Sequence, residues 1–371
     1  MLNHCVMTRR AALAGLGALP LLARPAGRFE QIDLFHQDDD GVHTYRIPAL
    51  LETRTGRLLA LVDARHDSDR DLPARISLVL RTSSDRGRTW SQPVTIRKVA
   101  DGGVGDASLM LDRRTGRVWC FHNYGPPGIG LMTAQPGERT GSKTLQVHAM
   151  YSDDEGATWS APRDLTPQFK DPAWQGMFSA SGTDIQLSTG RYVVPVTVRD
   201  TAGVMCARNI YSDDSGTTWK IGPSIAPGTD ESHCVELADG TVLQNMRNGH
   251  TRAVARSTDG GVTFGPVTHD AALIDPICNA SIARYRHGGR DLLLFTNAAS
   301  LKRENLTIKL SADGGVTWPI ARVIHAGPAS YSTVVVLNDG SIAVLYERGE
   351  KSPIEKITFA RFDLKWVEAA R

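Results

Sequence analysis

The chain alternates short apolar runs of strand length with polar turns. Leu58 to Val62, Tyr192 to Val198 and Ile342 to Tyr346 are examples of such runs. Each of these runs follows a turn whose glycine supplies the positive φ that a tight hairpin requires. After the first thirty residues, no long apolar run has a helical period. The pattern therefore predicts strands joined by hairpins.

Two turn motifs recur along the chain. The hairpin turn occurs six times, and a second motif, Ser-x-Asp-x-Gly-x-Thr followed by Trp or Phe, occurs five times; we call the second motif the aspartate box. Asp and Ser oxygens of a box accept hydrogen bonds from turn amides, and the aromatic ring buries against a neighbouring strand. The hairpin turns are Thr55-Gly56-Arg57, Thr115-Gly116-Arg117, Thr189-Gly190-Arg191, Asp239-Gly240-Thr241, Gly288-Gly289-Arg290 and Asp339-Gly340-Ser341. The boxes run from Ser83 to Trp90, Ser152 to Trp159, Ser212 to Trp219, Ser257 to Phe264 and Ser311 to Trp318.

The alternation of the two motifs predicts an all-β, six-bladed β-propeller. One unit of about fifty to seventy residues has the size of a four-stranded blade. The last unit, from about Ser341, has no box, and we expect strands from both ends of the chain, Phe29 to His36 and Ile357 to Val367, to close it. A β-sandwich or a β-helix does not explain this repeat. No linker or shift in composition divides the chain, so residues 28–371 are expected to form one domain.

The beginning of the chain has the features of an export signal. Arg9-Arg10 precede an apolar stretch from Ala11 to Ala23, and small residues follow around Ala26. Residues 1–27 are therefore interpreted as a signal peptide, and the paired arginines favour the twin-arginine route. A frayed N-terminal helix is the alternative. The apolar stretch is too short for a normal membrane span, so we expect a soluble protein in the periplasm or outside the cell.

Composition excludes some partners but does not decide whether the cysteines form disulfides. The net charge is +2 and the basic residues are scattered, so neither nucleic acid nor a membrane surface is an expected partner. Cys120, Cys206, Cys234 and Cys278 are widely spaced, which argues against a metal site made of thiolates. In an exported chain they form two disulfides or remain buried thiols, and the sequence does not decide between these states.

Tyr45-Arg46-Ile47-Pro48, together with the boxes, resembles the Arg-Ile-Pro motif that opens bacterial and animal sialidases. The resemblance extends from about Phe29 to Phe362. It implies a six-bladed propeller that acts as a retaining exo-α-sialidase on sialylated glycans. It implies no cofactor and no metal, and we expect a monomer.

The resemblance assigns three arginines to the substrate carboxylate. They are Arg46 in the Arg-Ile-Pro motif, Arg247 in Gln244-Asn245-Met246-Arg247-Asn248, and Arg303 ahead of the last box. Arginine suits this task because its planar fork pairs with a carboxylate through two hydrogen bonds and stays charged. Glu347 resembles the glutamate that orients the first of these arginines, and Arg65 resembles a further arginine that contacts substrate.

The resemblance also assigns a nucleophile and its base. Tyr331 matches the late tyrosine of the family, and Glu231 matches the partner glutamate. Sialidases are the glycosidases that use a tyrosine nucleophile, and a neutral phenol avoids repulsion from the substrate carboxylate. A free tyrosine is mostly protonated at neutral pH, so it requires an adjacent base. A buried core tyrosine is the alternative for Tyr331, and Glu236, the rival to Glu231, is interpreted as structural.

The acid/base is expected in the segment from Asp63 to Asp71. In the family that the chain resembles, an arginine is followed some residues later by the catalytic aspartate. Asp71 lies at the distance from Arg65 that best matches this pattern, with Asp69 as the runner-up and Asp67 behind it. The same acidic residues do not have the spacing of a calcium loop. Weaker candidates for substrate contact are Asp106 from the second repeat and Asp184 and Gln186 from the third. For each of these three residues, a role in turn structure is the alternative.

Three other functions remain open on the same scaffold. One is transfer of sialic acid to another sugar or release of an anhydro product. Another is hydrolysis of a related nine-carbon acid, because the sequence identifies no pocket for the N-acyl group. The third is a sialoglycan-binding propeller without turnover, which is disfavoured because every catalytic residue type that the family requires is present.

Overall fold

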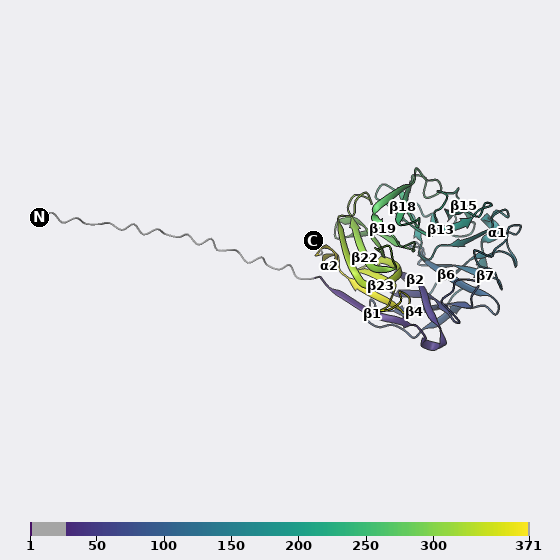
Figure 1. Ribbon diagram of the computed structural model, residues 1–371, viewed down its shortest axis with the longest axis horizontal. Helices are drawn as coiled ribbons and strands as arrows, with labels where there is room; N and C mark the ends of the chain where they lie inside the picture. The colour runs from purple at the N-terminus through teal and green to yellow at the C-terminus, as the bar shows by residue number, and fades with distance from the viewer. Residues whose placement is uncertain (2–26, 370–371) are drawn as a thin grey trace.

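A computed structural model describes residue 1 and residues 27–369 of the chain. The expected export signal therefore lies almost entirely outside the described residues. Within them, strands form six antiparallel blades arranged about a common centre (Figure 1). The predicted all-β, six-bladed β-propeller is confirmed.

The blades follow one another along the chain. The first blade contains β2 (Thr44–Glu52), β3 (Leu58–Arg65), β4 (Ile76–Ser83) and β5 (Val94–Arg97). The second contains β6 (Gly103–Leu111), β7 (Val118–Gly125), β8 (Gln146–Ser152) and β9 (Arg163–Asp164), and β11 (Gly182–Thr183) adds to β6 in parallel. The third contains β10 (Gly176–Ser179), β12 (Ile185–Gln186), β13 (Tyr192–Arg199), β14 (Met205–Ser212) and β15 (Lys220–Ile221).

The remaining three blades include one shared strand. The fourth blade contains β16 (Ser232–Glu236), β17 (Val242–Met246), β18 (Thr251–Ser257) and β19 (Thr268–Ile274). The fifth contains β20 (Ser281–His287), β21 (Arg290–Ala298), β22 (Glu304–Ser311) and the first half of β23 (Ile320–Val336). The second half of β23 opens the sixth blade, which continues through β24 (Ile342–Arg348), β25 (Lys356–Phe362) and β1 (Phe29–His36). Three short helical segments complete the fold: η1 (Asp39–Gly41), α1 (Thr166–Phe169) and α2 (Leu364–Glu368).

Each predicted turn motif occupies the same place in its blade. The six hairpin turns connect the first and second strands, and the five boxes connect the third and fourth. In the first box the hydroxyl of Ser83 accepts the N–H of Gly87, and Asp85 accepts the N–H and hydroxyl of Thr89. Trp90 packs edge-on against Phe359 of the sixth blade, with 5.1 Å between ring centroids. A box therefore closes its own turn and also seals a junction with the neighbouring blade.

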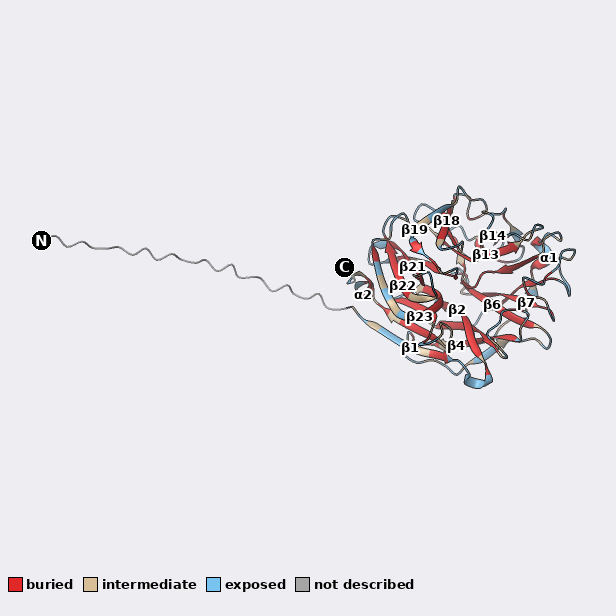
Figure 2. Ribbon diagram, in the orientation of Figure 1, coloured by how far each residue is buried: buried red, intermediate tan, exposed pale blue. Residues whose placement is uncertain are grey.

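The apolar core lies between adjacent blades. One buried cluster combines Leu59 and Leu61 of the first blade with Leu109 and Val118 of the second, and other clusters join further pairs in the same way. Burial is continuous along the central strands and gives way to exposed loops at the edges (Figure 2). Stacking of sheets thus buries the side chains of both faces, while the first strands of the blades remain near the centre of the ring.

Strands from both ends of the described chain close the ring, as predicted. β1 pairs with β25 in antiparallel register from Phe29 and Phe362 onward. The predicted closing strand from 357 to 367 was too long, because β25 ends at Phe362 and α2 begins at Leu364. Asp363 ends the strand because its side chain caps the helix by accepting the N–H of Trp366. The indole of Trp366 then stacks on Phe29.

Two further features of the described residues concern the cysteines and the membrane. Cys120, Cys206, Cys234 and Cys278 are all buried and unpaired with one another, so of the two states left open the structure shows free thiols. No helix in the part of the chain that the structure describes has the length and apolar character needed to cross a bilayer.

Candidate active site

A cavity of about 450 Å³ opens where the blades converge. Its polar wall contains Asp71, Asp106, Asp230, Glu231, Arg247 and Tyr331. These residues come from four of the six blades, and each lies on or next to a first or second strand, except Asp71, which lies in the loop after β3. The ring therefore brings together residues that are far apart in sequence.

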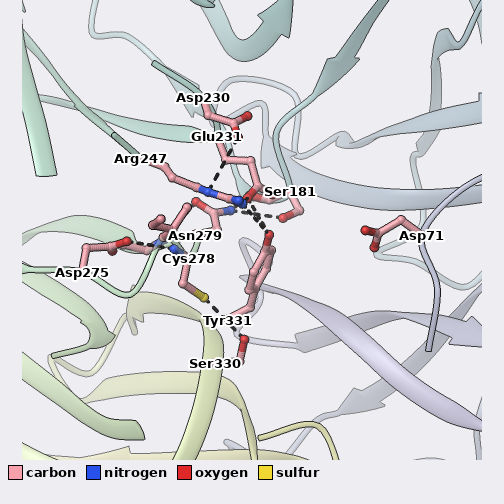
Figure 3. Close-up of polar contacts among 12 residues, drawn as sticks. Asp71, Ser181, Asp230, Glu231, Arg247, Asp275, Cys278, Asn279, Ser330 and Tyr331 are labelled. Atoms are coloured by element: carbon pink, nitrogen blue, oxygen red, sulfur yellow. Dashed lines mark hydrogen bonds and ion pairs between the residues drawn. The ribbon is translucent and has the colours of Figure 1, made fainter. Parts of the chain in front are cut away.

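Tyr331, Glu231 and Arg247 form a chain of direct contacts. The phenol of Tyr331 donates to Oε2 of Glu231 at 2.5 Å, and Nη1 of Arg247 donates to the same oxygen at 2.7 Å. Nη1 of Arg247 also lies 3.4 Å from the phenolic oxygen. Figure 3 shows the ring of Tyr331 rising toward Arg247 and Glu231, with Asp71 opposite. Tyr331 is only 8% exposed, and its hydroxyl is directed toward the cavity rather than into the apolar core.

Arg46 is fixed by a fully buried carboxylate. Its Nε and Nη2 donate to the two oxygens of Glu347 at 3.1 and 3.2 Å, and Glu347 is 0% exposed. The N–H of Ile47, which has a left-handed φ of 58°, also donates to Glu347. Burial disfavours the charge of Glu347, but the charge of Arg46 and the hydrogen bonds from Arg46 and from the N–H groups of Ile47 and Tyr331 together outweigh it and hold the pKa of Glu347 below its usual value. The structure thus places Glu347 where it orients Arg46.

Arg303 completes the group of three arginines. Its Nη1 donates to the hydroxyl of Ser330 and its Nη2 to the carbonyl of Ile277, both at 3.2 Å. The guanidinium carbons of Arg303 and Arg46 lie 5.7 and 5.3 Å from the centre of the Tyr331 ring. Together with the contact from Arg247, all three arginines that the sequence analysis selected therefore surround one tyrosine.

Asp71 approaches the cavity from the opposite side. Its carboxylate pairs with Nη2 of Arg65 at 2.7 Å, and its side chain is 75% exposed. Partial burial disfavours its charge, but the charges of Arg65, Arg46 and Arg303 outweigh this effect and lower the pKa of Asp71. The neighbouring acidic residues have other contacts: the carboxylate of Asp67 pairs with Arg75, and the main-chain carbonyl of Asp69 accepts from Arg65. Of the three aspartates considered for this position, Asp71 is the one that lines the cavity.

The environment of the tyrosine and glutamate favours their uncharged forms. Burial, followed by the charge of Glu231, raises the pKa of Tyr331 well above its usual value. Burial also raises the pKa of Glu231, although Arg247 opposes the shift. Because the two groups are joined by a hydrogen bond, only one of them is expected to be ionised at a time. A single negative charge beside three arginines is an arrangement suited to transferring a proton from the phenol to the carboxylate.

The weaker sequence candidates separate into two groups. Asp106 lines the cavity. Asp184 instead accepts a hydrogen bond from Ser108, and Gln186 accepts from the N–H of Arg113, so these two support the structure. Glu236, interpreted as structural, binds the N–H and hydroxyl of Ser188 outside the cavity.

Sequence reasoning missed much of the cavity wall. Asp230 lies 3.6 Å from Nε of Arg247, and its position next to Glu231 was the only signal for it. The apolar part of the wall comes from Leu72 and Pro73, from the loop between β7 and β8, and from two strands of the third blade. Ile47 of the Arg-Ile-Pro motif also lies in this wall, and the other members are Leu131, Met132, Leu145, Phe178 and Met205. No periodic pattern marks that loop, so nothing in the sequence predicted that it folds over the site.

Comparison with known proteins identifies the family. Residues 105–344 match the model of the BNR repeat-like domain. A sialidase from Micromonospora viridifaciens is 39% identical over 91% of this chain, and one from Bacteroides fragilis is 34% identical over 89% of it. The chain spans 54% and 64% of the lengths of these two relatives.

A solved structure gives the same result. The structure of the Hadza microbial sialidase Hz136 superimposes with a TM-score of 0.85 and 33% identity, covering 91% of this chain and 69% of the other. The family model covers more than half of the chain, and this relative is matched over more than two thirds of its length. The chain that places three arginines around Tyr331 therefore belongs to the sialidase family.

Proposed function

We propose that this protein is a retaining exo-α-sialidase that releases terminal sialic acid from glycans. The observation that carries the proposal is the contact of 2.5 Å between the phenol of Tyr331 and Glu231 beneath three arginines. Sialidase relatives that match about 90% of the chain support the same activity. The substrate class follows from the chemistry, because a carboxylate on the anomeric carbon is the group that a cradle of arginines recognises.

The substrate carboxylate is expected to bind the N–H groups of the arginines that do not already donate to protein groups. Nε and Nη2 of Arg46 are held by Glu347, which leaves Nη1 for the substrate carboxylate. Arg303 and Arg247 supply the remaining positive charge from the fifth and fourth blades. Because each guanidinium is held by a neighbouring group before substrate arrives, little reorganisation is needed on binding.

The first chemical step forms a bond between Tyr331 and the anomeric carbon. The phenolic oxygen attacks that carbon while its proton passes to Glu231, with which it already shares a hydrogen bond. The glycosidic bond breaks with its electron pair on the leaving oxygen, and Asp71 protonates that oxygen. Arg247 stabilises the charge that moves between Glu231 and the tyrosine.

The second step returns the enzyme to its starting state. Asp71, now ionised, accepts a proton from water, and the water oxygen attacks the anomeric carbon. The bond to Tyr331 breaks, and Glu231 returns its proton to the phenolic oxygen. Two displacements at one carbon give net retention. In the free enzyme, positive charges lower the pKa of Asp71; binding of a carboxylate to Arg46 and Arg303 screens that effect, which favours the protonated acid in the complex.

The decisive experiment traps the tyrosyl intermediate. Purified protein is incubated with 2,3-difluorosialic acid, and the intact mass and peptide map are then measured. We expect one added sugar on the peptide that contains Tyr331, and NMR of a turnover reaction should show the α-anomer of free sialic acid as the first product. A label elsewhere would overturn the nucleophile assignment. An anhydro or transferred product would replace hydrolysis with one of the other reactions of this scaffold.

Export belongs to the same proposal. The paired arginines Arg9-Arg10 and the apolar stretch after them support a twin-arginine signal, which would place the enzyme where extracellular glycans are accessible. Changing both arginines to lysine should leave the protein in the cytoplasm of the producing cell. Cell fractionation measures this, with the unchanged chain as the control.

A further inference from the structure

A buried ion pair in the fourth blade has no role in the proposed reaction. Nη1 of Arg252 on β18 lies 3.2 Å from Oδ2 of Asp275, and both side chains are 0% exposed. Nε of Arg252 donates to Oδ1 of Asn245 at 2.7 Å. Withdrawing two charges from water costs free energy that their attraction often only offsets, so such a pair is weak evidence of added stability. What the pair holds in place is the turn that follows β19.

The pair binds both backbone groups of Cys278. Oδ1 of Asp275 accepts the N–H of Cys278 at 2.8 Å, and Nη1 of Arg252 donates to the carbonyl of Cys278 at 2.7 Å. Cys278 lies in the segment 275–280, which leads from β19 of the fourth blade to β20 of the fifth; we call this segment the junction turn. The planar guanidinium fixes the directions of its bonds, so the pair sets the position of Cys278 closely.

The residue before Cys278 has a strained backbone. Ile277 has a φ of 61°, in the left-handed region, and its side chain is 40% exposed. A β-branched residue is an outlier in this region, because its Cβ lies too close to the following carbonyl oxygen. Such a conformation persists only where the surrounding structure imposes it, and it is concentrated at functional sites. The bonds from Arg252 and Asp275 to the next residue supply that constraint.

Both groups that hold the guanidinium of Arg303 contact the junction turn. Nη2 of Arg303 donates to the carbonyl of Ile277, and Nη1 donates to the hydroxyl of Ser330, each at 3.2 Å. Sγ of Cys278 lies 3.4 Å from the same hydroxyl, and Figure 3 shows the thiol directed toward Ser330. A displacement of the junction turn therefore moves one acceptor of Arg303 directly and the other through the thiol.

A similar arrangement holds Arg46. Ile47 is also a left-handed isoleucine, with a φ of 58°, and its N–H donates to the buried carboxylate of Glu347. In both places a buried acid fixes the backbone at or next to a left-handed isoleucine, beside one of the three arginines. Glu347 binds its arginine directly, whereas Asp275 acts through the carbonyl of Ile277. The recurrence is independent geometric support for a positioning role.

We propose that the buried pair Arg252–Asp275 holds the strained junction turn and thereby aims Arg303 at the carboxylate of the substrate, so that both members of the pair are positioning residues. The use of Arg303 for a carboxylate rests on the proposed sialidase function, whereas the dependence of Arg303 on the pair does not. The two claims are therefore tested by separate measurements.

The first test is steady-state kinetics of Asp275→Asn with a fluorogenic sialoside. Asparagine keeps an oxygen for the N–H of Cys278 but removes the charge that holds Arg252. We expect KM to rise about 10-fold while kcat changes less than about 2-fold, because the groups at the anomeric carbon are unchanged. In an Arg303→Lys background, Asp275→Asn should raise KM no further. A full additional rise in that background would overturn the proposal.

A second substitution separates positioning from general loss of stability. Glycine adopts the left-handed conformation without strain, whereas alanine does not. Combined with Asp275→Asn, Ile277→Gly should bring KM back to within about 3-fold of the wild-type value, and Ile277→Ala should not. Any other outcome for these two combinations overturns the role assigned to the junction turn.

The strain itself is measured in the single variants. Ile277→Gly should melt at a higher temperature than Ile277→Ala, which reverses the order found at ordinary positions. The opposite order would show that the turn is not strained and would overturn the proposal even if Asp275→Asn does not fold. In that case Arg252→Lys, which keeps the charge but loses the planar fork, replaces Asp275→Asn in the kinetics.

A matched control is a buried aspartate of the second repeat. Asp112 accepts hydrogen bonds from the N–H of Arg114 and the hydroxyl of Tyr192 away from the cavity. Asp112→Asn should lower the melting temperature without changing KM. Equal rises of KM in Asp112→Asn and Asp275→Asn would overturn the specific role of the pair.

The last test needs no activity. Hydrogen bonds from Nη1 and Nη2 of Arg303 hinder rotation of the guanidinium, so the two nitrogens should give separate signals in a ¹⁵N spectrum at low temperature. Arg303→Lys identifies these signals by their loss. Asp275→Asn should merge them, and separate signals in that variant would overturn the proposal. If wild-type protein hydrolyses no sialoside, the proposed function fails, and this spectrum still decides whether the pair positions Arg303.

Discussion

The phenol of Tyr331 and Oε2 of Glu231 lie 2.5 Å apart, although their positions in the chain are separated by 100 residues. Both side chains are buried, and Arg247 binds the same carboxylate oxygen. The proton path proposed for the first chemical step therefore exists before substrate binds. The predictions below follow from this contact and from the groups around it.

Replacing the proposed nucleophile should remove turnover without unfolding the protein. Phenylalanine at position 331 keeps the ring that packs with Ile47 and Cys278 but has no oxygen to attack the anomeric carbon. We expect Tyr331→Phe to lower kcat by at least about 10³-fold with little change in melting temperature. Tyr346→Phe, in another buried tyrosine of the same blade, is the control and should retain kcat. Normal turnover by Tyr331→Phe would falsify the nucleophile assignment.

The role of Asp71 should show in its dependence on the leaving group. A poor leaving group such as lactose needs a proton from the acid, whereas an aryl group with a low pKa leaves without one. Asp71→Ala should therefore lose about 10²-fold or more in kcat/KM on sialyllactose and much less on an aryl sialoside. Asp67→Ala, which breaks only the pair with Arg75, is the matched control. Equal losses on both substrates would exclude Asp71 as the acid.

Replacing Arg303 should affect mainly substrate binding, whereas replacing Arg247 should also affect the rate of the chemical step. Arg303 donates to Ser330 and to a carbonyl, so Arg303→Lys should raise KM about 10-fold while kcat changes little. Arg247 binds Glu231 directly and opposes the rise that burial causes in the pKa of Glu231, so Arg247→Lys should reduce kcat as well. Steady-state kinetics on one substrate measures both variants. The interpretation would be wrong if the two variants gave the same division between KM and kcat.

His233 should make the fold less stable in acid. Burial lowers the pKa of His233 from 6.5 to about 4, and its Nε2 is bonded to the carbonyl of Ser181. Unfolding therefore takes up a proton, so the free energy of unfolding falls as the pH drops below about 6.5, and the loss is complete below about 4. The shift corresponds to roughly 3 kcal/mol.

Denaturant unfolding at several pH values measures the contribution of His233. His233→Gln should flatten the decline in stability between pH 6.5 and 4, whereas the surface change His269→Gln should leave the curve parallel to that of the wild type. A decline of unchanged slope in His233→Gln would assign the acid sensitivity to other groups.

The blades were predictable because their signals are local. A hairpin turn such as Thr115-Gly116-Arg117, or a box such as Ser152 to Trp159, is complete within a few residues, so its repetition can be counted in the sequence. The main error in the strands came from the same reliance on local pattern. The apolar residues after Phe362 read as a continued strand, whereas the cap at Asp363 and the stacking of Trp366 on Phe29 favour a helix.

The site was only partly predictable because its contacts are long-range. The arginines and Tyr331 were found through motifs that resemble those of a known family. Asp63 was visible as part of an acidic segment, but its contact with Asp106 depends on how two blades pack. The apolar wall around Leu131 depends on the path of a loop without a repeat, and its residue types alone do not distinguish it from ordinary core.

The 17 residues of β23 belong to two blades. Up to Pro328 the strand pairs with β22, and from Ala329 it pairs with β24, so the passage from one blade to the next is a hydrogen-bonded ladder where other junctions have a loop. Tyr331 lies just beyond that passage. It lies in a bulge, where the pairing with β24 shifts between Ala329 and Ser332, and its N–H donates to the buried carboxylate of Glu347 instead of to the ladder. The proposed nucleophile is therefore held by the strand on either side of the bulge and by Glu347, so that adaptation to different substrates is expected to come from the loops around the cavity.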